Sequence, residues 1–374
     1  MTAGATSARK LGPAEPIPLS VVTGFLGAGK TTLLNRLLSD RGLRDTAVLV
    51  NEVGEIGLDH LFYEVLDGET VLLPGGCLCC SVRGDLVRAL EDILRGQDNG
   101  KRAPFRRVVV ETTGLADPAS ILHAMMTHPY LVQRYRLDGV VTLVDAVNGG
   151  ATLDEHREAV KQAAVADRLV LSKTDLAGAG EVAALRARLA ALNPAAPVLD
   201  AVKGEATAAA LLEAGLYDPA SKIADVKRWL AEAAVEAAEH AHHHVGEADH
   251  AHHDDRVRVF TLASEEALPA ATLESFLDLL RSIHGAKLLR LKGIVRLAEE
   301  PEQPVVLHAV QHVMHPPARL PAWPDGDRRS RLVCVTWDLD PAAVRRLFAA
   351  FLGRPQVDMP DRATLLENPL ATRR

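Results

Sequence analysis

The sequence predicts an α/β fold, in which a doubly wound, mostly parallel sheet is followed by a smaller α+β domain. Apolar runs alternate with helical patterns over residues 19–202, as in chains that build parallel sheets. The first run leads directly into the motif G-x-x-x-x-G-K-T at 24–31. After a histidine-rich segment at 240–255, a different order of strands and helices begins.

The strands of the first domain are predicted from short runs rich in valine and leucine. Because these runs are apolar on both faces, they are typical of parallel strands buried on both sides. Leucines at helical spacing in 32–40 and 86–94 indicate helices between the strands. The predicted strands are 19–25, 46–52, 69–76, 106–114, 138–146, 167–175 and 196–202.

A second group of elements follows a segment that cannot form a core. Residues 204–239 are rich in alanine and glutamate and predict helix, whereas 240–255 contains seven of the 15 histidines and only valine and alanine as apolar residues. Beyond it, 270–283 and 341–352 predict amphipathic helices. Antiparallel strands are predicted at 255–262, 286–297, 303–314 and 331–339.

These patterns divide the chain into five parts. They are a disordered N-terminal tail (1–16), the α/β domain (17–215), a helix with the histidine-rich linker (216–256), the α+β domain (257–355) and a C-terminal tail (356–374).

Composition and charge exclude several classes of function. The 374 residues are 48% hydrophobic and 24% charged, as in soluble globular proteins, and the net charge of −7 argues against a nucleic-acid partner. The N-terminus lacks the apolar core of a secretion signal, and no apolar run approaches the roughly 20 residues that span a bilayer. We therefore expect a cytoplasmic protein without a membrane partner.

The motif at 24–31 predicts a phosphate-binding loop and hence a P-loop NTPase fold. It follows a strand and opens a helix, so backbone N–H groups and the helix N-terminus point toward a phosphate. Lys30 is expected to reach the β- and γ-phosphates, the Thr31 hydroxyl to bind Mg²⁺, and Thr32 to contact the α-phosphate. A glycine-rich turn without a ligand is the alternative. The expected nucleotide-binding residues here are Gly24, Gly27, Ala28, Gly29, Lys30, Thr31 and Thr32.

The segment V-V-V-E-T-T-G at 108–114 predicts the second part of this site. Glu111 ends a strand where other P-loop proteins carry an acidic residue near Mg²⁺. Gly114 could donate its N–H to a γ-phosphate. Lys30 and Glu111 are therefore the candidate catalytic residues, although a cap or turn would also explain Glu111.

The segment S-K-T-D at 172–175 predicts recognition of a guanine base. Asp175 could accept hydrogen bonds from guanine N1–H and N2–H₂, and adenine offers no such pair of donors. The aliphatic part of Lys173 would lie along the base, and Ser172 could add a hydrogen bond. A solvated turn is the alternative for this short motif.

Three of the four cysteines lie within G-G-C-L-C-C, as Cys77, Cys79 and Cys80. Disulfides are rare in a reducing cytoplasm, so metal binding, redox chemistry and burial remain as explanations. Three thiolates suit a soft ion such as Zn²⁺, and one coordination position would stay open for a non-cysteine ligand, water or another protein. Cys334, in an alternating strand pattern, is predicted to lie in the core.

The segment N-E-V-G-E-I-G-L-D at 51–59 lies between the phosphate loop and the cysteines. Glu52 and Glu55 could face Mg²⁺ or a thiolate-bound metal, and Gly54 and Gly57 would let the segment move. We expect a switch that senses the nucleotide; a solvated acidic loop is the alternative.

Together these motifs resemble the CobW-like metal-chaperone GTPases, which are related to the nickel-insertion GTPases of urease and hydrogenase maturation. The resemblance covers 19–200 and, more loosely, 257–350, where H-G-A-K-L-L-R-L-K-G-I-V-R-L looks like the CobW C-terminal domain. The family more often has asparagine at the position of Ser172. We expect this departure to weaken nucleotide binding by about 1 kcal/mol at most, without loss of guanine preference.

The resemblance implies that the C-x-C-C segment carries a metal that is transferred, that 51–59 is a switch, and that Glu55 is linked to metal binding. The expected function is a GTP-hydrolysing metallochaperone, using GTP/GDP and Mg²⁺, that gives Zn²⁺, Co²⁺ or Ni²⁺ to a client apoprotein. Turnover should be slow, since no arginine finger or catalytic glutamine is evident. A cobalt, cobalamin or nickel assembly GTPase, a P-loop kinase and a passive metal store are the alternatives, and a homodimer is possible.

The histidine-rich segment could act as a weak metal depot, since exposed imidazoles bind Zn²⁺, Ni²⁺ and Co²⁺. A solvated linker with incidental metal affinity is the alternative. Histidines of the second domain show no ligand spacing and are expected on the surface or in packing. The candidate depot residues are His242, His243, His244, His250, His252 and His253.

Overall fold

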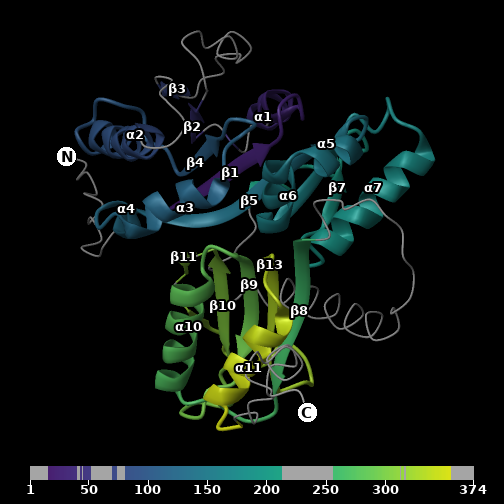
Figure 1. The fold of residues 1–374 in the computed structure, drawn as a ribbon. Helices are drawn as coiled ribbons and strands as arrows, with labels where there is room; N and C mark the ends of the chain where they lie inside the picture. Colours follow the sequence, from purple (N-terminus) through teal and green to yellow (C-terminus); the bar gives the residue numbers. More distant parts are fainter. Residues whose placement is uncertain are drawn as a thin grey trace, which may run out of the picture.

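A computed structural model describes residues 16–39, 43, 45–51, 70–73, 81–212, 256–311, 313–315 and 317–354. The described residues form two sheets, one in each predicted domain (Figure 1). No helix among them is both long and apolar enough to cross a membrane.

The first sheet has seven strands in the order β3-β2-β4-β1-β5-β6-β7, and every neighbouring pair is parallel. The predicted parallel sheet is thereby confirmed. Because the strands are parallel, their carboxyl ends share one edge, where such sheets bind ligands. The strands are β1 (Ile17–Gly24), β2 (Thr46–Asn51), β3 (Thr70–Leu73), β4 (Arg107–Glu111), β5 (Tyr135–Asp145), β6 (Arg168–Ser172) and β7 (Val198–Asp200).

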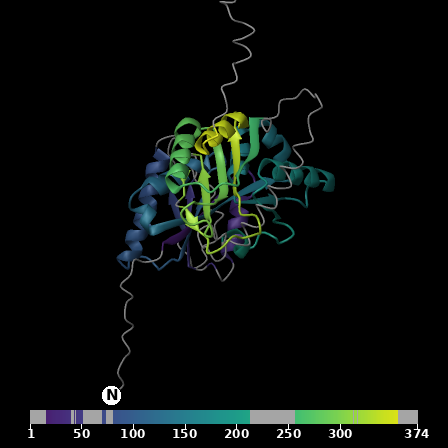
Figure 2. The ribbon, with the colours of Figure 1, turned by 90° about the horizontal axis from the view of Figure 1, so that it is seen from below.

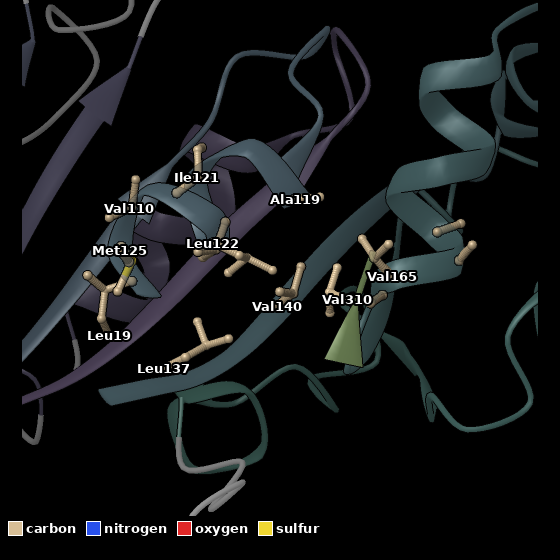
Figure 3. Packing of buried hydrophobic residues seen from close by; sticks show 14 of the residues in the cluster. Leu19, Val110, Ala119, Ile121, Leu122, Met125, Leu137, Val140, Val165 and Val310 are labelled. Carbon is tan, nitrogen blue, oxygen red and sulfur yellow. The ribbon is translucent and has the colours of Figure 1, made fainter. Parts of the chain in front are cut away.

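Alternate residues of each buried strand serve two separate hydrophobic cores. On β4, Val108 and Val110 join one core and Val109 joins the other. The smaller core packs against α1 (Lys30–Leu38) and α8 (Ala208–Leu212). The larger core, part of which is drawn in Figure 3, packs against helices on the opposite face. These are α2 (Ser81–Asp98), α3 (Pro118–Thr127), α4 (Leu131–Arg134), α5 (Gly149–Glu155), α6 (Arg157–Val165) and α7 (Ala179–Leu192).

The second domain is an antiparallel sheet in the order β11-β10-β9-β13-β8, with β12 paired to β10. Helices α10 (Ala270–His284) and α11 (Pro341–Phe351) share a hydrophobic core with it, and this core contains Cys334, as predicted. The strands are β8 (Val257–Ser264), β9 (Leu288–Val295), β10 (Val305–Val310), β11 (Val313–Met314), β12 (Ala318–Arg319) and β13 (Ser330–Trp337).

The single strand predicted at 303–314 is in fact two strands. β10 ends at Val310 and β11 starts at Val313. Gln311 between them has a φ of 51°, in the left-handed region that few residues other than glycine adopt. The backbone therefore turns here, which the apolar pattern alone did not reveal.

The two domains pack directly against each other (Figures 1 and 2). Strand β9 contacts α6, and β11 contacts α3. Val310 of β10 belongs to the same hydrophobic core as Val140 and Val165, and Figure 3 shows these side chains together. Burial of apolar area stabilises this contact by about 25 cal/mol per Å².

Buried charges add to the contact between the domains. Arg290 of β9 donates to the backbone oxygen of Val165 and to the carboxylate of Asp167, which follows α6. Lys292 lies 3.1 Å from the same carboxylate, and the backbone N–H of Val140 donates to it at 2.9 Å. Burial alone would raise the pKa of Asp167, but Arg290 and Lys292 hold that pKa well below its usual range.

Candidate nucleotide-binding site

The phosphate loop connects the end of β1 to the start of α1. Gly24, Gly27 and Gly29 have φ values of 138°, 73° and 89°, which glycine adopts without steric cost. At Gly24 a Cβ atom would also lie 2.4 Å from the backbone oxygen of Leu143 on β5. The sequence can form this loop because glycine stands at each of these positions.

Lys30 is the first residue of α1 and its side chain turns back into the loop. Its Nζ atom donates to the backbone oxygen of Gly24 at 2.9 Å and to that of Phe25 at 3.3 Å. The side chain is almost fully buried. The ammonium group is thus held within the loop that would surround the phosphates.

Thr31 and Glu111 come together from two elements that are far apart in the sequence. The Thr31 hydroxyl donates to the Glu111 carboxylate at 3.3 Å, and Glu111 is only 4% exposed. The contact arises because β4 lies beside β1, with Glu111 paired to Val22. A carboxylate and a hydroxyl are oxygen ligands of the kind that Mg²⁺ prefers, so the residues fit a magnesium site.

The loop of residues 112–117 after β4 lies against the phosphate loop. A Cβ atom at Gly114 would be 2.5 Å from the backbone nitrogen of Leu26. The Thr112 hydroxyl donates to the Thr23 hydroxyl at 2.7 Å, and Asp117 caps α3 by accepting from the Ala119 N–H. Gly114 is therefore next to the phosphate loop, as its predicted role requires.

Ser172 contacts the phosphate loop directly. Its hydroxyl donates to the backbone oxygen of Ala28 at 2.7 Å. The shorter serine side chain thus connects the end of β6 to the loop. The sequence predicted that Ser172 could hydrogen-bond, but not which atom it would contact.

Lys173 forms an ion pair that sequence reasoning missed. Its backbone has a φ of 57°, and its Nζ atom lies 2.6 Å from the carboxylate of Asp145 at the end of β5. Burial raises the pKa of Asp145, but hydrogen bonds from Lys173, the Val147 N–H and Asn148 outweigh burial and lower it. Asp145 remains ionised and orients the lysine stem.

A second carboxylate, also missed, organises the loop after β7. Asp200 accepts from the Thr174 hydroxyl at 2.8 Å and from the Val202 N–H at 2.9 Å. Arg36 of α1 donates to the backbone oxygens of Ala201 and Ala206. The helix that begins at the phosphate loop therefore also holds this loop. The signal in the sequence was an aspartate at the end of each of two predicted parallel strands.

Asp175 lies beside these loops with an exposed side chain. The ends of β5, β6 and β7 thus bring together Asp145, Lys173 and Thr174 at one edge, next to Ala28 of the phosphate loop. This arrangement places charged side chains at the edge of the sheet where a base would bind.

The predicted metal residues lie outside the described part of the chain: Cys77, Cys79, Cys80, Glu52, Glu55, His242, His243, His244, His250, His252 and His253. Within the described residues, no group of three or more His, Cys, Asp and Glu side chains could hold a metal ion. β2 ends at Asn51 and β3 at Leu73, so the chain segments with Glu52 and with the cysteines both follow carboxyl ends of the sheet.

A glycine-rich loop between a parallel strand and a helix, with a carboxylate on the adjacent strand, defines a P-loop nucleotide-binding protein. Residues 18–200 match the family model "CobW/HypB/UreG, nucleotide-binding domain", and 257–352 match "Cobalamin synthesis protein cobW C-terminal domain". The chain belongs to the CobW/HypB/UreG family. It is 30% identical to "Zinc chaperone CobW" of Sinorhizobium sp. over 371 residues, covering 90% of this chain and 97% of that protein.

Two further relatives each match about half of this chain. "Zinc chaperone YjiA" of Escherichia coli is 42% identical over 191 residues, covering 51% of this chain and 59% of that protein. "Zinc-regulated GTPase metalloprotein activator 1" of Schizosaccharomyces pombe is 36% identical over 197 residues, and the match spans 47% of its length. The chain thus spans about half the length of these two curated relatives.

The fold also matches a solved structure over both domains. The crystal structure of Zn(II)-bound YjiA GTPase from E. coli superposes with a TM-score of 0.65 at 26% identity, covering 90% of this chain and 99% of that one.

Proposed function

We propose that this protein is a GTP-hydrolysing metallochaperone that binds zinc at Cys77, Cys79 and Cys80 and transfers it to a client apoprotein. The observation that carries this proposal is that the nucleotide loops and the segment with the cysteines follow carboxyl ends of the same parallel sheet. Relatives named as zinc chaperones and as a zinc-regulated GTPase support it.

The nucleotide would be held in three parts. Backbone N–H groups of Gly27, Ala28 and Gly29, with Lys30, would bind the β- and γ-phosphates, and Thr32 the α-phosphate. The Gly114 N–H would donate to the γ-phosphate. Thr31 and Glu111, together with Glu52, would bind Mg²⁺. When bound, Mg²⁺ neutralises charge on the phosphates.

The base would be read at the ends of β5, β6 and β7. Asp175 would accept from guanine N1–H and N2–H₂, with the stem of Lys173 along the ring. The ion pair of Lys173 with Asp145 at 2.6 Å supports this, because it fixes the lysine next to Asp175. Ser172 would act through Ala28 by holding the phosphate loop against β6.

The transferred metal is cargo rather than a resident cofactor. Three thiolates, with Glu55 as a candidate fourth ligand, suit Zn²⁺ and also accept Co²⁺ or Ni²⁺. If GTP and Mg²⁺ order the segment at 51–59, hydrolysis would release it and change the metal site. Intrinsic turnover would be slow, and the client would act in the cytoplasm.

The histidine-rich segment would serve as a labile depot that supplies the cysteines. A homodimer is compatible with this scheme but is not needed for it. We propose the domain boundaries that the sequence predicts, with the nucleotide domain at 17–215 and the C-terminal domain at 257–355.

The proposal is tested by zinc binding and by nucleotide hydrolysis in matched variants. Cys79→Ala should lose zinc affinity in a competition with a chromophoric chelator and retain GDP binding. Cys334→Ala is the control, because Cys334 is buried in the core of the second domain. The wild type should hydrolyse GTP in preference to ATP. Unchanged zinc affinity in Cys79→Ala would refute the chaperone proposal.

A further inference from the structure

Two adjacent residues of α6 hold the loop of residues 112–117, although neither belongs to a recognised nucleotide-binding motif. Lys161 forms an ion pair with Asp117 at 3.1 Å. Gln162 is fully buried and contacts Gly114 and Ala116 of the same loop. The helix therefore holds the loop through two adjacent side chains, which make three polar contacts with it.

The contact made by Gln162 fixes the orientation of its amide group. Its Nε2 atom donates to the backbone oxygen of Gly114 at 3.1 Å and to that of Ala116 at 3.0 Å. Rotating the amide would place its oxygen against two carbonyl oxygens, so only the observed orientation is favourable. The backbone of Gln162 is fixed too, because its carbonyl oxygen accepts from the Thr142 hydroxyl of β5 at 2.7 Å.

The loop that Gln162 holds has little room to shift. A Cβ atom at Gly114 would already lie 2.5 Å from the Leu26 backbone nitrogen. Gln162 lines a small pocket of about 30 Å³ together with Phe25 and Leu26 of the phosphate loop. Even a small displacement of Gly114 would therefore alter its close contact with the phosphate loop.

We propose that Gln162 is a positioning residue for GTP, holding the loop so that the Gly114 N–H points toward the γ-phosphate. This inference rests on the proposed role of Gly114. Gln162 does not touch the nucleotide; it acts through the backbone carbonyl groups of Gly114 and Ala116. GDP lacks the γ-phosphate, so Gln162 would favour GTP over GDP rather than strengthen binding of both.

The test compares GDP with a non-hydrolysable GTP analogue, each with Mg²⁺. Gln162→Met keeps the size of the side chain and removes both donors. We expect GDP affinity within about twofold of wild type and analogue affinity lower by roughly tenfold, as for the loss of one to two hydrogen bonds. Hydrolysis of GTP in a single turnover should slow as well.

Asn193 provides a matched control. Its buried Nδ2 atom also donates to two backbone oxygens, of Ala163 and Ala166, each at 2.9 Å at the far end of α6. Asn193→Leu should lower stability as much as Gln162→Met does, and leave the ratio of analogue to GDP affinity unchanged.

Gln162→Glu provides a second variant that keeps the volume of the side chain. A carboxylate facing two carbonyl oxygens should weaken analogue binding, and protonation at lower pH should partly restore it by supplying one donor. If both variants keep the wild-type ratio of affinities, the inference is wrong. If the wild type itself does not distinguish the analogue from GDP, the proposed role of Gly114 is wrong instead.

Discussion

Ser172 holds the phosphate loop and is not the residue that we propose to read the base. Its hydroxyl donates to the backbone oxygen of Ala28 at 2.7 Å, which connects the end of β6 to the phosphate loop. The Asp175 side chain, three residues later, is exposed, and the contact with the phosphate loop is made by Ser172. Loop geometry and the proposed base selection would thus depend on different residues of the same motif.

Ser172→Ala should therefore weaken nucleotide binding without changing base preference. Removing the hydroxyl leaves a buried carbonyl oxygen without that donor, which costs about 1 kcal/mol and lowers GDP affinity about fivefold. Isothermal titration with GDP and ADP measures both effects. Ser264→Ala, which removes a buried hydroxyl in the second domain, is the control. A change in the ratio of GDP to ADP affinity would contradict this account.

At the scale of elements, α6 connects the nucleotide edge to the second domain. Lys161 and Gln162 contact the loop after β4, and the last residue, Val165, accepts from Arg290 of β9. The second domain reaches the same loop directly, because Gln311 between β10 and β11 donates to Asp117 at 3.1 Å. A shift of this loop would therefore alter contacts with both domains.

His315, after β11, should make the stability of this region depend on pH. Burial lowers the pKa of His315 to about 4, although Asp167 opposes the shift, whereas an unfolded histidine titrates near 6.5. Between these values the unfolded chain binds more protons, so stability falls as the pH falls from about 6.5 toward 4, by up to about 3 kcal/mol.

Urea unfolding at pH 7 and pH 4.5 tests this prediction in the wild type and in His315→Gln. The variant cannot gain this proton, so its loss of stability over the same interval should be smaller. Equal losses in the two proteins would show that His315 does not titrate as predicted. The stacking of His315 on His308, at 4.5 Å between ring centroids, makes far-UV circular dichroism at pH 7 a necessary check of folding.

At the scale of the whole molecule, the two domains are joined around the carboxylate of Asp167. This residue is fully buried, and Arg290 and Lys292 reach it from the second domain. Such a network contributes little to the free energy of unfolding compared with an apolar contact of the same size. Removing one partner is nevertheless costly, because it leaves the other charges buried without an opposite charge.

Asp167→Asn should lower the free energy of unfolding by about 3–5 kcal/mol, because it leaves Arg290 and Lys292 buried without the carboxylate. The control is Glu302→Gln, which breaks an exposed ion pair with Arg328 and should cost under about 1 kcal/mol. Urea denaturation of both variants measures the difference. A cost below about 1 kcal/mol for Asp167→Asn would mean that this network does not hold the domains together.

Much of the fold could be predicted from the sequence because its signals are local. Runs such as Val108–Val110 predict a strand buried on both faces, and the glycines at 24, 27 and 29 predict the phosphate loop. The contacts of Gln162, Asp200 and Arg36 could not be predicted, because they join segments that meet only in the folded chain. Gln311 was missed because glutamine gives no local sign of a positive φ.

We propose above all that the bound nucleotide, GTP or GDP, controls the affinity of the protein for the metal. GTP binding and metal binding must then affect each other by the same factor, because coupling between two sites is reciprocal. The most direct measurement is the zinc dissociation constant, by chelator competition, with Mg²⁺ and either GDP or a non-hydrolysable GTP analogue. We predict that the two constants differ by at least about tenfold, which corresponds to about 1.4 kcal/mol. Equal constants with the two nucleotides would contradict the account.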